Sequence, residues 1–197
     1  MTDTLNVKII LGSTRPKRIS EHLTPWVLEQ VKKAGGIEAE VLDLRDYPMP
    51  FYDEAVTPSG IKDGNYEKDV VKKWAQKIEE ADGYIIITPE YNHSIPAVLK
   101  NALDYVYYPW NKKAVGFVAY GTVGGARAVE HLRGVAAELQ MVSARVVVHI
   151  PAPWSLQDES GAFKPGALEP FEGAAKGMLE QLIWWGKAAK GARAEEK

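Results

Sequence analysis

Short runs rich in Val and Ile alternate with longer amphipathic segments along most of the chain, and this alternation constrains the fold more than any other feature. The runs are VKIILG (7–12), EAEVLDL (38–44), YIIIT (84–88), AVGFVAYG (114–121) and ARVVVHI (144–150). The first, third and fourth are too apolar for strands with one face in water, so we place them inside a parallel sheet.

The segments between these runs have the apolar periodicity of helices. Helices are expected near 20–34, over 67–81, over 96–108, around 129–139 and from about 170 to 189. Pro96 suits a first helical turn, but Pro25 falls inside the first helix, which either kinks there or restarts with Thr24 as its cap. The pattern predicts an α/β fold with a doubly wound five-stranded parallel sheet, order 2-1-3-4-5, and helices on both faces.

Length and composition indicate one domain over residues 1–197, with 187–197 as a polar tail. The net charge of -2 gives no reason to expect nucleic acid or an anionic membrane as a partner. The chain has no cysteine, which excludes disulfides, thiolate ligands and cysteine nucleophiles. Neither a signal pattern nor a membrane-length apolar run is present, so we expect a cytoplasmic protein.

The loops after the first and third strands should carry the functional site. In open parallel sheets, ligands bind beyond the carboxyl ends of the strands at the switch in strand order, which here lies between the first and third strands. The irregular stretch 45–66 follows the second strand and is either a lid over that site or a surface excursion.

The loop after the first strand, GSTRPKRIS (12–20), precedes a helix and is rich in cations and hydroxyl groups. These residues are Ser13, Thr14, Arg15, Lys17, Arg18 and Ser20. Backbone N–H groups, a helix dipole and cations together favour a phosphate. Because G-x-G-x-x-G and the P-loop pattern are both absent, a mononucleotide phosphate is predicted. The alternative is a solvated basic loop in which Ser20 caps the helix.

The loops after the fourth and third strands also have unusual compositions. YGTVGGARA (120–128) carries three glycines, which favours close approach of a flat ligand over a plain turn. TPEYNHSIP (88–96) places an acid, an aromatic ring, an amide and an imidazole between two prolines. Such a stiff backbone suits the edge of a planar heterocycle; the alternative is a proline-bounded connection.

Three segments in order resemble the NADPH-dependent FMN reductase family, whose members are flavodoxin-like quinone, azo-dye and chromate reductases. They are LGSTRPKR, TPEYNHSIPAVLKNALDYV and GFVAYGTVGGARAVEHLR, and the resemblance runs from about residue 6 to 150. The second segment is the most specific. Pro25 departs from the pattern, and the region after 150 carries no motif that matches.

The resemblance implies FMN bound without a covalent link. The FMN phosphate would contact Ser13, Arg15 and Ser20, with Arg18 nearby. The flavin ring and ribityl chain would contact Pro89, Glu90, Tyr91 and Asn92. The pyrimidine end of the ring would contact Gly121, Thr122, Gly124 and Gly125. Family members form dimers or pairs of dimers, for which the helix 96–108 and the aromatic run 105–110 are candidate boundaries.

The implied activity is hydride transfer from NADPH or NADH to bound FMN and then to a small flat oxidant such as a quinone, azo compound, chromate or free flavin. The cofactor supplies the hard chemistry, so no catalytic side chain is expected. The four histidines are scattered, so no metal site is expected either. Two alternatives stay open: a flavodoxin-type electron carrier or redox sensor, and a flavin-free domain that binds another phosphate ligand.

Overall fold

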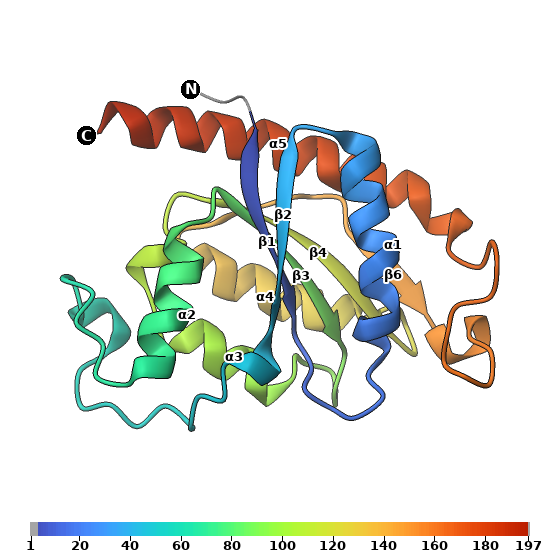
Figure 1. Cartoon of the computed structure of the whole chain (residues 1–197), viewed down its shortest axis with the longest axis horizontal. Helices are drawn as coiled ribbons and strands as arrows, with labels where there is room; N and C mark the ends of the chain where they lie inside the picture. Colours follow the sequence, from blue (N-terminus) through green and yellow to red (C-terminus); the bar gives the residue numbers. More distant parts are fainter. Residues whose placement is uncertain (1–3, 197) are drawn as a thin grey trace.

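The computed structural model describes residues 4–196 and places one parallel sheet between two layers of helices (Figure 1). Its strands are β1 (Leu5–Leu11), β2 (Ile37–Asp43), β3 (Gly83–Pro89), β4 (Ala114–Gly121), β5 (Val142–Ser143) and β6 (Val148–Pro151). The hydrogen-bonded order is β2-β1-β3-β4-β5, with β6 also paired to β4, and every pair is parallel. The expected order is confirmed. Each residue of β3 is buried, as its apolar run predicted.

Helices cover both faces of the sheet. They are α1 (Ile19–Ala34), α2 (Asp69–Glu79), α3 (Ala97–Asp104), α4 (Ala126–Glu138) and α5 (Glu172–Glu195). Side chains of α1 and α5 share one core cluster, and those of α2, α3 and α4 share the other. Short 3-10 turns complete the chain: η1 (Leu44–Asp46), η2 (Pro58–Gly60), η3 (Tyr108–Trp110), η4 (Pro153–Leu156) and η5 (Glu169–Phe171).

The fifth strand position differs from the expected continuous strand over 144–150. It consists of two short pieces, β5 and β6, which pair with successive parts of β4. Between them the backbone leaves the sheet, and the N–H groups of Arg145 and Val146 donate to the Gln181 side-chain oxygen on α5 at 2.7 and 3.2 Å. A side chain on the covering helix therefore replaces the missing ladder bonds.

Three helix boundaries also differ from expectation. The first helix runs unbroken through Pro25, and its cap is Arg18 rather than Thr24, whose hydroxyl donates to the Ser20 carbonyl at 2.7 Å. The third helix ends at Asp104, because the chain turns there into η3. The last helix continues through Glu195, so most of the expected polar tail is helical.

The aromatic run 105–110 fills the core and does not form a surface patch. Trp110 is fully buried, and its ring lies 4.7 Å from that of Tyr84 and 6.0 Å from that of Trp74. Tyr105 is also buried, whereas Tyr107 and Tyr108 are partly exposed. Most of this run is therefore core, and its place at a subunit boundary stays a prediction.

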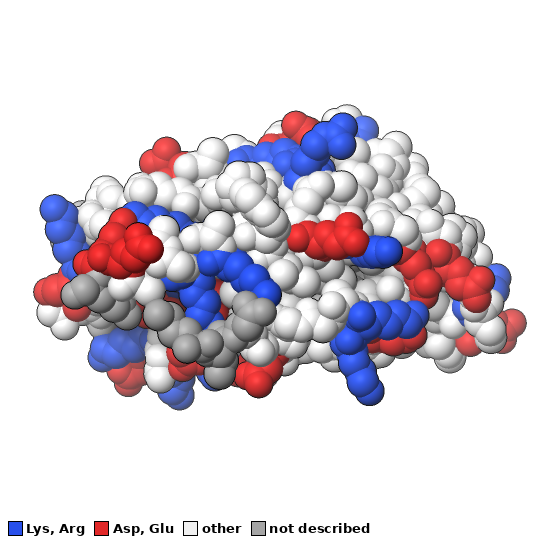
Figure 2. All heavy atoms as spheres, turned by 90° about the horizontal axis from the view of Figure 1, so that it is seen from above, with Lys and Arg blue, Asp and Glu red and all other residues white. Residues whose placement is uncertain are grey.

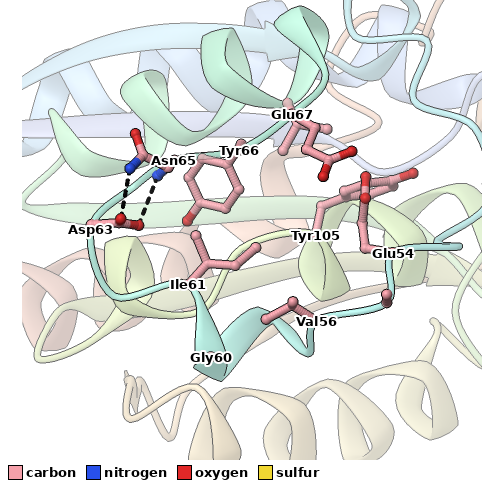
Figure 3. Close-up of a pocket in the computed structure, with 11 residues that line it drawn as sticks. Glu54, Val56, Gly60, Ile61, Asp63, Asn65, Tyr66, Glu67 and Tyr105 are labelled. Atoms are coloured by element: carbon pink, nitrogen blue, oxygen red, sulfur yellow. Dashed lines mark hydrogen bonds between the residues drawn. The ribbon is translucent and has the colours of Figure 1, made fainter.

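The irregular stretch 45–66 is anchored along α3. Asn101 donates to the Pro50 carbonyl at 2.7 Å and accepts from the Tyr52 N–H at 2.9 Å. Farther along, the stretch lines a cavity of about 290 Å³ together with Glu67, Val71 and Tyr105; Tyr66 and Tyr105 are labelled in Figure 3. That cavity includes no residue of the loops after β1, β3 or β4.

The face of the molecule that carries α5, seen from above in Figure 2, has no dominant patch of one charge. In Figure 2, Lys and Arg side chains on this face are interspersed with Asp and Glu. No helix among residues 4–196 combines the length and apolar character needed to cross a bilayer.

Candidate functional site

The loops after β1, β3 and β4 meet at the carboxyl edge of the sheet around a cavity of about 280 Å³. The cavity is lined by Arg15, Lys17, Arg18, Ile19, Pro89, Glu90, Tyr91, Tyr120, Gly121 and Trp154. Parallel strands end at one edge, which explains why loops far apart in sequence converge here.

Sequence reasoning identified only part of this lining. Ser13 and Ser20 lie buried beside it, whereas Thr122 and Asn92 are exposed outside it, and Gly124 and Gly125 are buried behind it. The cavity also includes Lys17, which the sequence analysis placed in the basic loop, and three residues that it did not single out: Ile19, Tyr120 and Trp154. Tyr120 could be found as the last large residue of an inner strand. Trp154 follows β6, in a region without a recognisable motif.

The three cations of the phosphate loop differ in their partners. Arg18 is buried, and its guanidinium donates to both carboxylate oxygens of Asp43 and to Glu21 at 3.1 Å. Arg15 and Lys17 are exposed, and neither forms an ion pair with a carboxylate of the described residues. Two of the three positive charges are therefore available to an anionic ligand.

The pKa values of both Arg18 and Asp43 are shifted from their usual values. Burial acts to lower the pKa of Arg18, but the hydrogen bond and charge of Asp43 outweigh it, and the pKa is raised. Burial likewise acts to raise the pKa of Asp43, but hydrogen bonds from Arg18 and the Arg45 N–H outweigh it, and the pKa is lowered. Both groups therefore stay charged at neutral pH.

Buried hydroxyl groups border the cavity. The Ser13 and Tyr91 hydroxyls lie 3.0 Å apart, which ties the loop after β1 to the loop after β3. The Ser20 hydroxyl is fully buried and has no hydrogen bond of good geometry among the described residues. The Tyr120 phenol lies close to Ser20, and burial, only partly offset by contact with Ser20, raises the pKa of Tyr120 to about 12.

These groups meet the requirements of a phosphate ester. An unsatisfied buried hydroxyl, the first turn of α1 and two unpaired cations lie within one short loop. The cavity continues past them to Tyr91, Gly121 and Trp154, which offer aromatic and backbone surface for a flat group. The donor set therefore fits FMN better than it fits a free inorganic anion.

The segment Tyr91–Ser94 is a tight two-residue turn. Its end residues exchange both backbone hydrogen bonds at 2.9 Å, and Asn92 and His93 have φ values of 48° and 68°. Positive φ at both central residues is the hairpin turn of type I′, for which asparagine is favoured. The amide of Asn92 thus has a conformational role, and its side chain is exposed.

The Glu90 carboxylate binds the first turn of α4 through Arg127. Its side chain is 5% exposed, pairs with the Arg127 guanidinium and accepts from the Arg127 N–H at 3.1 Å. Burial acts to raise the pKa of Glu90, but the bonds from Arg127 outweigh it and lower the pKa. This carboxylate caps a helix and is unsuited to act as an acid, and Arg127 is already paired.

The glycine loop is explained by the backbone itself. Gly121, Gly124 and Gly125 have φ values of 156°, 71° and 73°. A Cβ on Gly125 would lie 2.7 Å from the Ala119 Cβ, and one on Gly124 would lie 3.0 Å from the His149 Cβ. The number of glycines in this loop is therefore no independent argument for a flat ligand, contrary to the expectation from sequence.

Replacing Glu90 by glutamine is expected to lower the free energy of unfolding by about 1 to 3 kcal/mol at pH 7, because α4 loses a charged, buried cap. A depressed folded pKa gives stability that is present above the unfolded pKa of about 4.3 and lost as pH falls through the folded pKa. Urea denaturation from pH 3 to 7 should show the difference from wild type shrinking in acid. Glu130→Gln, on the exposed side of α4, should cost far less; an equal cost would contradict the cap.

The fold and the site together define a class: doubly wound α/β proteins that hold a phosphate-bearing ligand at the carboxyl edge of the sheet. The model of the NADPH-dependent FMN reductase family matches residues 5–154. The chain belongs to this family, as its motifs indicated. The region from 155 onward, including α5, lies outside the match.

Several relatives support this assignment. The chain is 39% identical over 150 residues to an NAD(P)H-dependent FMN reductase of Schizosaccharomyces pombe, covering 76% of this chain and 72% of the relative. It is 38% identical over 166 residues to a 2-hydroxy-1,4-benzoquinone reductase of a Burkholderia species, covering 79% and 81%. The flavoenzyme NAD(P)H:(acceptor) oxidoreductase FerB of Paracoccus denitrificans has the same fold, with a TM-score of 0.71, 21% identity and coverage of 94% and 99%.

Proposed function

We propose that this chain is an NAD(P)H-dependent oxidoreductase that holds FMN non-covalently in the cavity at the carboxyl edge of the sheet and reduces a small flat acceptor. One observation carries the proposal. The cavity joins two cations that have no carboxylate partner among the described residues to an open rim of aromatic side chains and Gly121, and the buried Ser20 hydroxyl lies beside it. Family membership supplies the reaction class.

The phosphate would be held by Ser13, Ser20, Arg15 and Lys17, in a loop that ends at the first turn of α1. Arg18 also borders the cavity, but its charge is already balanced by Asp43. When bound, FMN supplies the chemistry: it takes hydride from NAD(P)H and passes electrons to the acceptor.

The ring would lie against the loops after β3 and β4. The Tyr91 hydroxyl is held by the Ser13 hydroxyl, and Gly121, which has no side chain, lines the same cavity. Pro89 and Glu90 would contribute mainly backbone, because the Glu90 carboxylate is committed to α4. Val123 and Trp154, 47% and 56% exposed, offer apolar surface on which a flat cosubstrate or acceptor would rest.

An anaerobic absorption titration tests the proposal. FMN-loaded protein, freed of excess flavin, should bleach on addition of NADPH and recover its yellow colour when a quinone is added. Flavin that binds but stays oxidised with NADPH and with NADH would favour the carrier or sensor. Failure to retain flavin would contradict the assignment of the cavity.

Three finer points belong to the proposal. The acceptor is a quinone, azo compound, chromate or free flavin, and steady-state assays with each would rank them. The chain is expected to assemble into dimers or pairs of dimers, which sedimentation velocity would test. A cytoplasmic location is also retained as a prediction.

A further inference from the structure

Three successive carbonyl groups of the phosphate loop accept hydrogen bonds from two arginine side chains. Arg18 donates through Nη1 to the Ser13 carbonyl. Arg45, in η1 after β2, donates through Nε to the Thr14 carbonyl at 3.3 Å and through Nη2 to the Arg15 carbonyl. One planar guanidinium thus bridges two adjacent peptide groups, which is a geometry that lysine does not provide.

Holding these carbonyls also sets the direction of the N–H groups that follow them. In a planar trans peptide, the C=O and the N–H of the next residue point in opposite directions. Fixing the Ser13 and Thr14 carbonyls therefore fixes the N–H groups of Thr14 and Arg15. Successive N–H groups held in this way form the concave anion sites found in many phosphate loops.

The two arginines are themselves oriented by carboxylates. Glu21, in the first turn of α1, accepts from Arg18 at 3.1 Å and also from Arg45. Asp43, at the end of β2, accepts from Arg18 and from the Arg45 N–H at 2.9 Å. Charges of alternating sign thus connect the end of β2, the phosphate loop and α1.

We propose that Arg45, Glu21 and Asp43 are positioning residues that set the affinity of the cavity for the phosphate group of its ligand. None of the three lines the cavity. They act by holding the carbonyl side of the loop, directly through Arg45 and indirectly through the orientation of Arg18. This inference rests on the proposed function, because it concerns the same phosphate.

A simple charge effect predicts the opposite sign for one of these residues. Glu21 adds a negative charge close to the proposed anion site, so neutralising it should tighten phosphate binding if only charge mattered. If Glu21 orients the two arginines that hold the loop carbonyls, the same change should weaken phosphate binding. Arg45→Lys gives a second contrast, because it keeps the charge and removes the fork that spans two carbonyls.

The experiment measures FMN and riboflavin dissociation constants by flavin fluorescence for wild type, Glu21→Gln and Arg45→Lys. We expect FMN binding about threefold to tenfold weaker in Glu21→Gln and about tenfold weaker in Arg45→Lys, which is about 1.4 kcal/mol per tenfold change. Riboflavin, which lacks the phosphate, should bind as in wild type. Glu29→Gln, two turns farther along α1 and paired among residues 4–196 with Lys33 alone, is the matched control and should not change FMN binding.

Tighter or unchanged FMN binding in Glu21→Gln, or unchanged binding in Arg45→Lys, would overturn the proposal. Melting temperatures near that of wild type show that the variants fold, which the partial exposure of both side chains favours. Backbone NMR order parameters of the flavin-free protein separate the inference from the proposed function. The N–H vectors of Thr14 and Arg15 should have lower order parameters in both variants whether or not FMN is the ligand, and unchanged order parameters would refute the orienting role of the two arginines.

Discussion

Replacing Gly125 by alanine is expected to lower the free energy of unfolding by about 2 to 5 kcal/mol and to abolish tight FMN binding. Its φ of 73° costs an L-residue about 1 to 2 kcal/mol. The new Cβ would also lie 2.7 Å from the Ala119 Cβ and 2.9 Å from the Tyr120 N, both in the buried strand β4. Relieving such overpacking costs about 1 to 3 kcal/mol of stability. Urea denaturation of the flavin-free protein and flavin fluorescence titration measure the two effects.

Gly134→Ala is the matched control for this change. Gly134 lies on the exposed side of α4, the helix whose N-cap is Gly125, and a Cβ there would meet no atom within 4 Å. Alanine should raise the free energy of unfolding by about 0.5 to 1 kcal/mol, as expected in an exposed helix interior. If Gly125→Ala were as stable as wild type, the close packing of the glycine loop on β4 would be contradicted.

Replacing Arg15 by alanine is expected to weaken FMN binding by about tenfold to a hundredfold, the equivalent of one charge-assisted hydrogen bond. The free energy of unfolding should change by less than about 0.5 kcal/mol, because Arg15 is exposed and its guanidinium pairs with no described carboxylate. Riboflavin affinity should change little. Flavin fluorescence titration and urea denaturation of the same preparations provide the comparison.

Lys32→Ala is the control for removal of one positive charge, because Lys32 is exposed in the last turn of α1, far from the phosphate loop. It should bind FMN as wild type does. An Arg15→Ala variant with wild-type FMN affinity would remove the phosphate assignment of the loop after β1.

The sheet was predictable because its central strands are mostly apolar. An unbroken run such as YIIIT has no polar face to turn toward water, so it is buried between helices, and parallel order follows from the helices between strands. The fifth strand was less predictable. Its interruption depends on Gln181, which lies on another element and accepts the N–H groups that β4 does not.

The convergence of the three loops was predictable from topology, but the partners of their charged residues were not. Arg15 and Arg18 belong to one basic cluster in sequence, yet only Arg18 is buried against Asp43. Glu90 and Arg127 are far apart along the chain, and they form an ion pair in the fold. Such pairings depend on which side chains meet across neighbouring elements, and no local pattern encodes them.

By itself, the sequence determined the strand order, the edge at which the loops meet and the family, because apolar periodicity and motif spacing are local properties that survive without coordinates. Only the tertiary structure decided which cations remain unpaired, why the glycine loop needs its glycines and that Trp154 borders the cavity. The physical reason is that burial and charge pairing are properties of residues brought together from distant positions, and their energies depend on a neighbourhood that exists only after folding.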